Sequence, residues 1–390
     1  MKDDKKVPQL RFPEFTDAWK QRKLGDIATF LNGRAYSQDE LQSSGKYKIL
    51  RVGNFYTNDS WYYSDMELGE KFYANKGDLL YTWSATFGPH IWEGDKVIYH
   101  YHIWKIALTE FLDKMFALQL LEQDKSNLLN NLNGSTMVHM TKLGMESKQV
   151  IIPNSLEEQA KIGSFFTQLD NTITLQQRKL NSLQKLKKGL LQKMFPKKGE
   201  NIPEIRFPEF SDAWKQRKFG EFVERKSDSA LSSTSIPSVE YENVESETGI
   251  LKKDIYVKTE FKKGVLFSDK DVLYGKLRPY LHNWLAPSFT GVAVGDWWVL
   301  SPKNCSKDFL YRLLQTLTFD EIANQTSGTK MPRADWNLVS STAFYIPSSI
   351  EEQAKIGSLF NRIDSTITLQ QRKLESLQKL KKGLLQQMFI

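Results

Sequence analysis

The chain has 390 residues, a length that suggests two or three domains. Its 54 basic and 46 acidic residues give a net charge of +8 and a pI near 9.1, which favours a nucleic-acid partner without establishing one. A single cysteine, Cys305, excludes a disulfide framework and a cysteine-rich zinc site. No apolar run approaches the roughly 20 residues of a membrane span, and the N-terminus lacks the apolar region of a signal peptide, so we expect a soluble, cytoplasmic protein.

The first recognisable segment, Arg11–Lys23, occurs twice. It reads R-F-P-E-F-T-D-A-W-K-Q-R-K, and Arg206–Lys218 reads R-F-P-E-F-S-D-A-W-K-Q-R-K. A second match at nearly the same spacing links 153–195 with 347–389, so we interpret the chain as one unit used twice.

Two middle segments, 24–151 and 219–345, follow the first repeat and have diverged almost completely. Short β-branched and aromatic runs between Gly, Asn and Asp predict strands joined by loops, and we expect helices over 111–132 and 308–324. Several short matches survive, among which 49–55 pairs with 238–244, 76–81 with 269–274, and His90–Trp92 with His282–Trp284. Each middle is therefore predicted to be a mixed α/β domain.

The second repeat, 153–195 and 347–389, predicts a long helix in each half. Ser155 with Glu158, and Ser349 with Glu352, have the spacing of a capping box. Apolar residues then recur at steps of four and three, the pattern of helices that wind around each other; in the first copy they are Ile162, Phe166, Leu169, Ile173, Leu180, Leu183, Leu190 and Met194. A helix of this length reaches about 60 Å, too long for the core of one small domain, so we interpret it as a spacer.

Polar residues interrupt this apolar seam at Gln176 and Gln370 and at Lys187 and Lys381, where they would weaken the pairing but fix its register. The alternative is a local shift of the seam onto Leu186 and Leu380. Further apolar residues beside the seam widen the stripe and predict a surface for a partner helix, with packing on the protein's own domains as the alternative. They are Phe165, Leu186, Leu191, Leu359, Leu380 and Leu385.

The order of domain, helix, domain, helix predicts an α+β architecture with an internal pseudo-two-fold repeat. If the two helices pair, they run antiparallel, the domains lie at opposite ends of the rod, and Ile390 lies near Arg11–Lys23. The predicted boundaries are a first mixed α/β domain at 1–152, a first spacer at 153–195, a linker at 196–203, a second mixed α/β domain at 204–346 and a second spacer at 347–390.

Catalytic motifs are missing from the sequence. It contains no G-x-x-x-x-G-K-[ST] phosphate loop, no G-x-S-x-G elbow, no H-E-x-x-H helix and no N-P-P-[FYW] run. His100 and His102 could face one way on a strand and bind a metal, but without further ligands nearby a structural role is favoured. We therefore expect no catalytic and no metal site, and instead two like modules that bind two different half-sites.

The two repeats together closely resemble the specificity subunits of type I restriction-modification systems. The resemblance rests on R-F-P-E-F-T-D-A-W-K-Q-R-K-L-G-D-I, on the helix start P-x-S-[LI]-E-E-Q-x-K-I-G and on the ending L-x-S-L-Q-K-L-K-K-G-L-L-Q, and it covers the full chain. It implies a non-catalytic subunit that reads a bipartite, asymmetric target in double-stranded DNA. It also implies that the helices bind two modification subunits, which methylate adenine N6, and that restriction subunits join them.

The cofactors that the resemblance implies, S-adenosylmethionine, ATP and Mg²⁺, belong to those partner subunits. Two alternatives remain at this point: a coiled-coil interaction scaffold without DNA specificity, and a self-contained methyltransferase or nuclease.

The DNA-contacting residues are predicted from chemistry alone, since Arg and Lys read guanine, Asn and Gln read adenine, and nearby cations bind phosphates. In the first domain the candidates are Arg34, Tyr36, Arg51, Asn54 and Lys142. In the second domain they are Lys276, Arg278, Tyr280, Asn283, Lys330 and Arg333. Asn54 aligns with Asn243, which favours a turn role for Asn54 over base reading.

Overall fold

The computed structural model describes residues 7–56, 58–84, 86–131, 140–252, 254–257, 260–325 and 331–390. The chain forms two compact units: unit 1 contains Met1–Gln177 and Lys373–Ile390, and unit 2 contains Arg178–Arg372. Within the described ranges, no helix is both long enough and apolar enough to cross a membrane.

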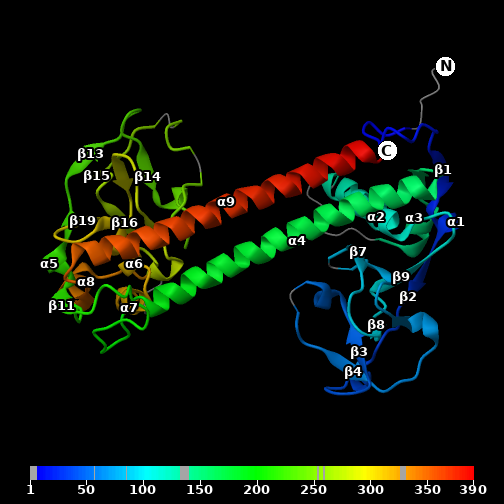
Figure 1. The fold of residues 1–390 in the computed structure, drawn as a ribbon, viewed down its shortest axis with the longest axis horizontal. Helices are drawn as coiled ribbons and strands as arrows, with labels where there is room; N and C mark the ends of the chain where they lie inside the picture. The colour runs from blue at the N-terminus through cyan, green and yellow to red at the C-terminus, as the bar shows by residue number, and fades with distance from the viewer. Residues whose placement is uncertain are drawn as a thin grey trace. The chain divides into compact units, whose positions relative to one another are not determined.

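Unit 1 is built on two four-stranded sheets and one two-stranded sheet (Figure 1). The first sheet has the order β2 (Ala28–Asn32), β9 (Ile103–Leu108), β6 (Leu79–Thr82), β7 (Gly88–Ile91). The second has the order β4 (Tyr62–Ser64), β3 (Tyr47–Leu50), β8 (Val97–Tyr99), β5 (Tyr73–Ala74). Strands β1 (Lys20–Lys23) and β10 (Gln149–Ile152) form the small sheet, and α1 (Leu24–Ile27), α2 (Lys114–Asn131) and α3 (Lys142–Ser147) complete the unit.

Unit 2 repeats this plan except at one strand: the fourth strand of its second sheet joins the opposite edge of that sheet. Its first sheet has the order β12 (Val223–Lys226), β19 (Trp297–Pro302), β16 (Val272–Gly275), β17 (Trp284–Leu285). Its second has the order β13 (Ser229–Leu231), β15 (Lys263–Phe267), β18 (Gly291–Val294), β14 (Ser238–Glu240), and β11 (Lys215–Lys218) pairs with β20 (Ala343–Ile346). The helices are α5 (Phe219–Phe222), α6 (Lys307–Leu313), α7 (Leu317–Ala323) and α8 (Trp336–Ser341).

Two details of the middles differ from the sequence prediction. The helix expected over 308–324 is two helices, α6 and α7, because the Thr316 hydroxyl accepts a hydrogen bond from the Phe319 amide and caps a new helix. The match of His90–Trp92 with His282–Trp284 is wrong: Leu80 pairs with His90, whereas the corresponding Leu273 pairs with Leu285. The match of 76–81 with 269–274 agrees with the strand pairing, since Tyr81 pairs with Trp104 and Tyr274 with Trp298.

The predicted long helices are present as α4 (Leu156–Lys193) and α9 (Ile350–Met388). Ser155 and Ser349 cap them, since each hydroxyl accepts a hydrogen bond from the amide three residues later, at 3.3 Å. The carboxylate half of the predicted capping box has another role, because Glu158 and Glu352 bind side chains of the first repeat instead.

Each of these two glutamates lies in a buried triad. Arg11 donates to both oxygens of Glu158 at 2.6 and 2.8 Å, and the Trp19 indole donates to the same carboxylate at 3.1 Å. Arg206 and Trp214 bind Glu352 at the same three distances. In each unit, the first repeated segment supplies the arginine and the tryptophan, and the second repeated segment supplies the glutamate. The triad therefore attaches the segment before each domain to the helix after it.

The helix ends pack into the cores of the units. In unit 1, Phe389 at the end of the chain packs against Trp19 and Phe116, and the Leu10 amide donates to the Gln387 carbonyl at 2.9 Å. This confirms the prediction that the closing end lies near Arg11–Lys23. In unit 2, Phe195 makes the same contacts with Trp214 and Phe309.

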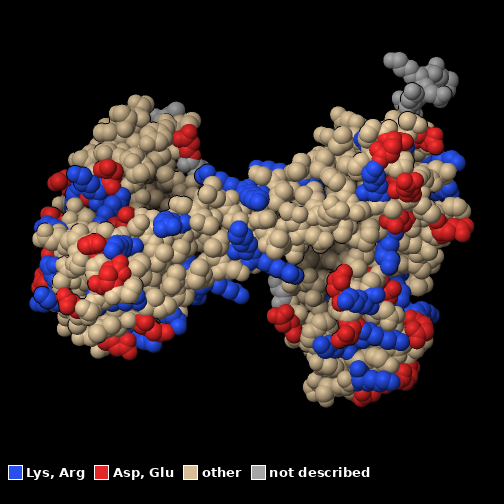
Figure 2. Space-filling view, viewed as in Figure 1, with Lys and Arg blue, Asp and Glu red and all other residues tan. Residues whose placement is uncertain are grey.

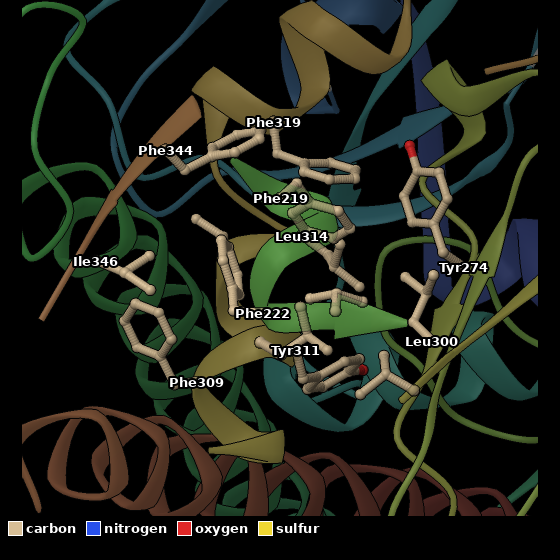
Figure 3. Close-up of a cluster of buried hydrophobic side chains, with 14 of the residues drawn as sticks. Phe219, Phe222, Tyr274, Leu300, Phe309, Tyr311, Leu314, Phe319, Phe344 and Ile346 are labelled. Atoms are coloured by element: carbon tan, nitrogen blue, oxygen red, sulfur yellow. The ribbon is translucent and has the colours of Figure 1, made fainter. Parts of the chain in front are cut away.

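The largest cluster of buried side chains belongs to unit 2 and joins the domain to both long helices. Phe219, Phe319 and Phe344 face one another in its centre (Figure 3), with ring centroids 5.6 to 5.9 Å apart. Ile356 and Phe360 of α9, together with Met194 just after α4, belong to the same cluster.

The lysines in the helix seam are paired across it. Lys187 of α4 binds Asp364 of α9 at 2.7 Å in unit 2, and Lys381 of α9 binds Asp170 of α4 at 2.6 Å in unit 1. Only 16 % of the Lys187 side chain is exposed, against 51 % of Leu186, so the alternative of a shifted seam is wrong. The helices run antiparallel within each unit, as predicted.

The buried triad is expected to contribute strongly to stability. Glu158→Gln leaves the Arg11 guanidinium without its counter-charge in a buried position, and we expect a loss of about 3–5 kcal/mol in the free energy of unfolding. Glu14→Gln removes a carboxylate that pairs with Lys161 at the surface and should cost less than about 1 kcal/mol. Urea unfolding of the two variants compares them directly, and equal losses would contradict the assigned role of the triad.

The two seam lysines should differ in importance. Without Lys187, Asp364 keeps an ion pair with Arg312 at 2.7 Å. Without Lys381, Asp170 keeps, among the residues that the structure describes, a hydrogen bond from Gln119 at 3.1 Å and no second cation. We therefore expect Lys381→Leu to destabilise the protein by about 1–2 kcal/mol more than Lys187→Leu, because a carboxylate that has lost its cation is costly when partly buried. Urea denaturation measures both, and a larger loss for Lys187→Leu would refute the explanation.

Candidate nucleic-acid interface

Lys276 and Arg278, two of the basic residues predicted in unit 2, lie on a turn between β16 and β17. Arg278 has φ 47° and ψ 65°, the left-handed conformation, and His282 has φ 52°, so both ends of the short helix at Pro279–Leu281 are strained. Such a conformation in a non-glycine residue costs about 1–3 kcal/mol and persists only where the surroundings enforce it.

Backbone hydrogen bonds hold this turn in place. The Arg278 amide donates to the Pro332 carbonyl at 2.7 Å, the Lys276 amide donates to the Asp296 carbonyl at 2.9 Å, and the Ala334 amide donates to the Lys276 carbonyl at 2.8 Å. An isolated β-bridge joins Leu277 to Arg333. The fold thus brings Lys276, Arg278 and Arg333 together although Arg333 lies far along the chain.

The three cations differ in whether they pair with Asp296. Its carboxylate accepts hydrogen bonds from Arg333 at 3.1 and 3.3 Å and lies 3.7 Å from the Lys276 ammonium. The Arg278 side chain is exposed, and its guanidinium makes no hydrogen bond or ion pair within the described ranges. Arg278 is therefore the cation of this turn whose planar fork is available for a ligand.

The other unit 2 candidates fall into three groups. Tyr280 is 53 % exposed beside Arg278 and can contact a ligand. Asn283 is only 4 % exposed, and its side-chain oxygen accepts from the Ser246 hydroxyl at 3.0 Å, so a base-reading role for Asn283 does not fit this structure. Lys330 lies outside the described residues.

The candidates in unit 1 gather around His100. An isolated β-bridge joins Arg34 to His100, the Tyr36 ring stacks on the His100 ring with centroids 6.3 Å apart, and the Arg51 charge contributes to lowering the His100 pKa. Arg34 forms an ion pair with Glu40 and lies over the Tyr36 ring, and burial raises the pKa of Tyr36 to about 12.

Arg51 lies over the Tyr62 ring at 4.3 Å and also donates weakly to the Ser60 carbonyl. Asn54 has a turn role, because its oxygen accepts from the Arg51 amide and its nitrogen donates to the carbonyls of Asn58 and Ser60. Lys142 begins α3 and faces Glu146 at 3.5 Å.

The sequence prediction did not include the aromatic residues that complete this surface. Tyr101 is exposed and lies between His100 and His102, with ring centroids 4.5 and 3.9 Å away. Burial, together with His102 and Arg51, lowers the pKa of His100 to about 4, so its imidazole is neutral at pH 7. Within the described ranges no group of three or more His, Cys, Asp or Glu could hold a metal ion. The run H-Y-H is the sequence signal for this cluster, but taken alone it indicates only a metal site or a structural role.

The apolar residues predicted for partner binding are not equally accessible. Leu186 and Leu380 are exposed, and Phe165 is partly exposed. Leu191 and Leu359 pack partly against the unit 2 core. Leu385 is only 4 % exposed within the unit 1 core, so it is not available to a partner. Two residues absent from the prediction, Leu175 and Leu369, are the most exposed apolar side chains of α4 and α9.

Comparison with known proteins identifies the family. The model of the type I restriction modification DNA specificity domain matches residues 16–185 and again residues 212–379. The chain therefore belongs to this family and contains the domain twice; it is a DNA specificity subunit of the type I kind.

Similar proteins cover almost the whole chain. The type I restriction enzyme MjaVIII specificity subunit from Methanocaldococcus jannaschii is 24 % identical over 98 % of this chain and 93 % of its own length. The crystal structure of the type I restriction-modification S subunit from M. genitalium has a TM-score of 0.66 at 14 % identity, covering 98 % of this chain and 99 % of that one. A chain from a structural study of complex assembly in the type I R-M system has a TM-score of 0.51 at 13 % identity, covering 95 % and 97 %. The two structures support the fold.

His282, at the end of the basic turn, should make unit 2 sensitive to pH. Its ring nitrogens lie 2.9 Å from Asp320 and 3.4 Å from Glu247, and the hydrogen bond with Asp320 is the main reason that its pKa is raised above 6.5. A raised pKa stabilises the fold below pH 6.5, and this contribution is lost as the pH rises through the folded-state value.

We therefore expect His282→Gln to cost roughly 0.5–1 kcal/mol at pH 5.5 and little at pH 9. Urea unfolding at both pH values measures the difference. A loss that is independent of pH would show that His282 contributes packing and not charge.

Proposed function

We propose that this specificity subunit reads a two-part, asymmetric target in double-stranded DNA, with unit 1 on one half and unit 2 on the other. The observation that carries the proposal is the contrast between the copies: the first sheet has the same strand order in both units and three strands of the second sheet correspond, while the side chains at matched loops differ. The loop that follows β6 in unit 1 begins with Trp83, and the loop that follows β16 in unit 2 begins with Lys276. A shared scaffold with different loops is expected to read different bases.

Arg278 is our leading base-reading residue in unit 2. A guanidinium can donate two parallel hydrogen bonds to guanine O6 and N7 in the major groove, and a rigid turn reduces the entropy lost on binding. Lys276 and Arg333, held by Asp296, then supply positive charge for nearby phosphates. In unit 1 we assign the equivalent role to Arg34 and Arg51, with Tyr36 and Tyr101 beside them.

The long helices are proposed to bind two modification subunits, to which restriction subunits are added. Exposed leucines on the helices support this proposal: Leu175 and Leu380 in unit 1, and Leu186 and Leu369 in unit 2. Residues 178–193 hold six Lys or Arg and no Asp or Glu, and basic side chains gather on the long helices in Figure 2. In this proposal methyl transfer and cleavage, with their S-adenosylmethionine, ATP and Mg²⁺, are the work of the partner subunits in the cytoplasm.

Substitution of Arg278 tests whether each unit reads its own half of the DNA target. Arg278→Gly removes the side chain but keeps the turn, because glycine adopts positive φ without strain. In a selection of bound duplexes from random DNA by the assembled complex, we expect the wild type to enrich a two-part motif and Arg278→Gly to relax one part only.

Arg278→Lys separates charge from geometry. Lysine keeps the positive charge but lacks the planar fork, so overall DNA affinity should fall little while the same part of the motif relaxes. Lys303→Gln, an exposed change in unit 2 that disrupts only the ion pair with Glu224, is the matched control and should leave both parts intact. If the wild type enriches no motif, the proposed function fails and a plain scaffold is favoured.

A further inference from the structure

A large open pocket lies within unit 2, between the end of α4, the first half of α9 and the segments around Trp284 and α7. Its volume is about 1450 Å³. Small-molecule sites usually measure about 300–1,000 Å³, so this pocket has the size to take a segment of polypeptide.

Apolar and basic side chains share the lining. Leu191, Phe195 and Trp284 contribute apolar wall, and Leu317, at the start of α7, is exposed at the pocket. Lys188 and Lys198 also line it, both are exposed, and neither makes an ion pair with a residue that the structure describes.

Three acidic residues of the lining are paired with basic residues of the same lining. Asp364 is shared by Lys187 and Arg312, and His282 binds both Glu247 and Asp320. Burial lowers the pKa of Lys187, although Asp364 opposes that shift. In unit 1 the position of Arg312 is taken by the neutral Gln119, which donates to Asp170. The pocket of unit 2 therefore has a surplus of positive charge built into its wall and rim.

The pocket is also continuous with the surface proposed for partner binding. Leu369, an exposed leucine of α9, lines one edge of it. A partner helix that covers Leu369 would bring its adjoining chain to the mouth of the pocket. A DNA duplex would leave the apolar wall uncovered, because protein–DNA interfaces are polar and strongly charged.

We propose that this pocket binds an acidic segment of the modification subunit, with apolar side chains of that segment against Leu191 and Trp284 and its carboxylates near Lys188 and Lys198. The inference rests on the proposed function, because it specifies how one modification subunit is held. Unit 2 would thereby bind its partner through a positively charged pocket. Unit 1 has the neutral Gln119 in place of Arg312 and so does not reproduce this charge.

Charge reversal at the rim gives the first test. For Lys188→Glu with Lys198→Glu, we expect the dissociation constant for the purified modification subunit to rise about tenfold or more and to lose part of its salt dependence, since rim charges steer association. Lys263→Glu with Lys270→Glu is the control, because both are exposed lysines of unit 2 that lie outside the long helices and do not line the pocket. An unchanged affinity of the double variant would overturn the proposal.

Site-specific cross-linking gives the second test. A photo-reactive phenylalanine analogue is placed at Leu317 in the pocket, at Leu369 on the helix, or at Val257, an exposed residue that does not line the pocket. In the complex of full chains, we expect Leu317 to cross-link to a peptide of the modification subunit rich in Asp and Glu, and Val257 to give no such product.

The outcomes of cross-linking distinguish a failure of the pocket assignment from a failure of the proposed function. Cross-links from Leu369 without any from Leu317 would overturn the pocket assignment and leave the proposed function standing. Cross-links from Leu317 to a basic peptide or to DNA would equally refute it. If no complex forms with the wild-type chain, the proposed function itself is contradicted.

Discussion

The structure depends on one buried contact that is made twice: the carboxylate at the start of each long helix, held by an arginine and a tryptophan from the segment that precedes each domain. A carboxylate buried in this way is tolerated only because its hydrogen bonds are satisfied and its charge is paired. The contact joins the segment before each domain to the start of the helix after it, so the two ends of the domain lie side by side. The middle of the domain can then change its sequence while both of its ends stay fixed.

The same logic explains where the sequence has diverged. The Arg–Glu–Trp triads, the two-stranded sheets and the aromatic residues at the helix ends recur in both copies, and all of them fasten domains to helices. The turns at the ends of β6 and β16 carry Trp83 and Lys276 at matched positions, and they lie outside these domain-to-helix contacts. Specificity can therefore change in one unit at little cost to the stability of either.

The sequence predicted the parts of the fold that repeat or have a strong period. The heptad spacing predicted both long helices, and the order of domains and helices predicted that they pair antiparallel. The twin of Arg11–Lys23 correctly placed the chain end beside that segment. The lysines of the seam could not be interpreted from spacing alone, since only the structure shows Asp364 and Asp170 opposite them. Glu158 was assigned to a cap because the arginine that binds it is 147 residues away.

The candidate interface was harder to predict, because its residues meet only through tertiary contacts. Sequence reasoning selected Lys276, Arg278 and Arg333 by residue type, but it gave no sign that Asp296 pairs with Lys276 and Arg333. It also selected Asn283, whose burial depends on a distant serine, and Leu385, whose twin Leu191 is less buried. Whether a side chain can contact DNA or a partner depends on the residues packed around it. Residue type and hydrophobic period do not predict which distant residues those are.

The most direct test of the account is a map of adenine methylation in genomic DNA from cells without other adenine methylases. The cells would express this chain with its modification subunit, and control cells would express the modification subunit alone. The account predicts one asymmetric motif in two separated parts, methylated on both strands and absent from the control. Methylation that is unchanged without this chain, or a motif with a single part, would contradict the claim that the two units read two different halves.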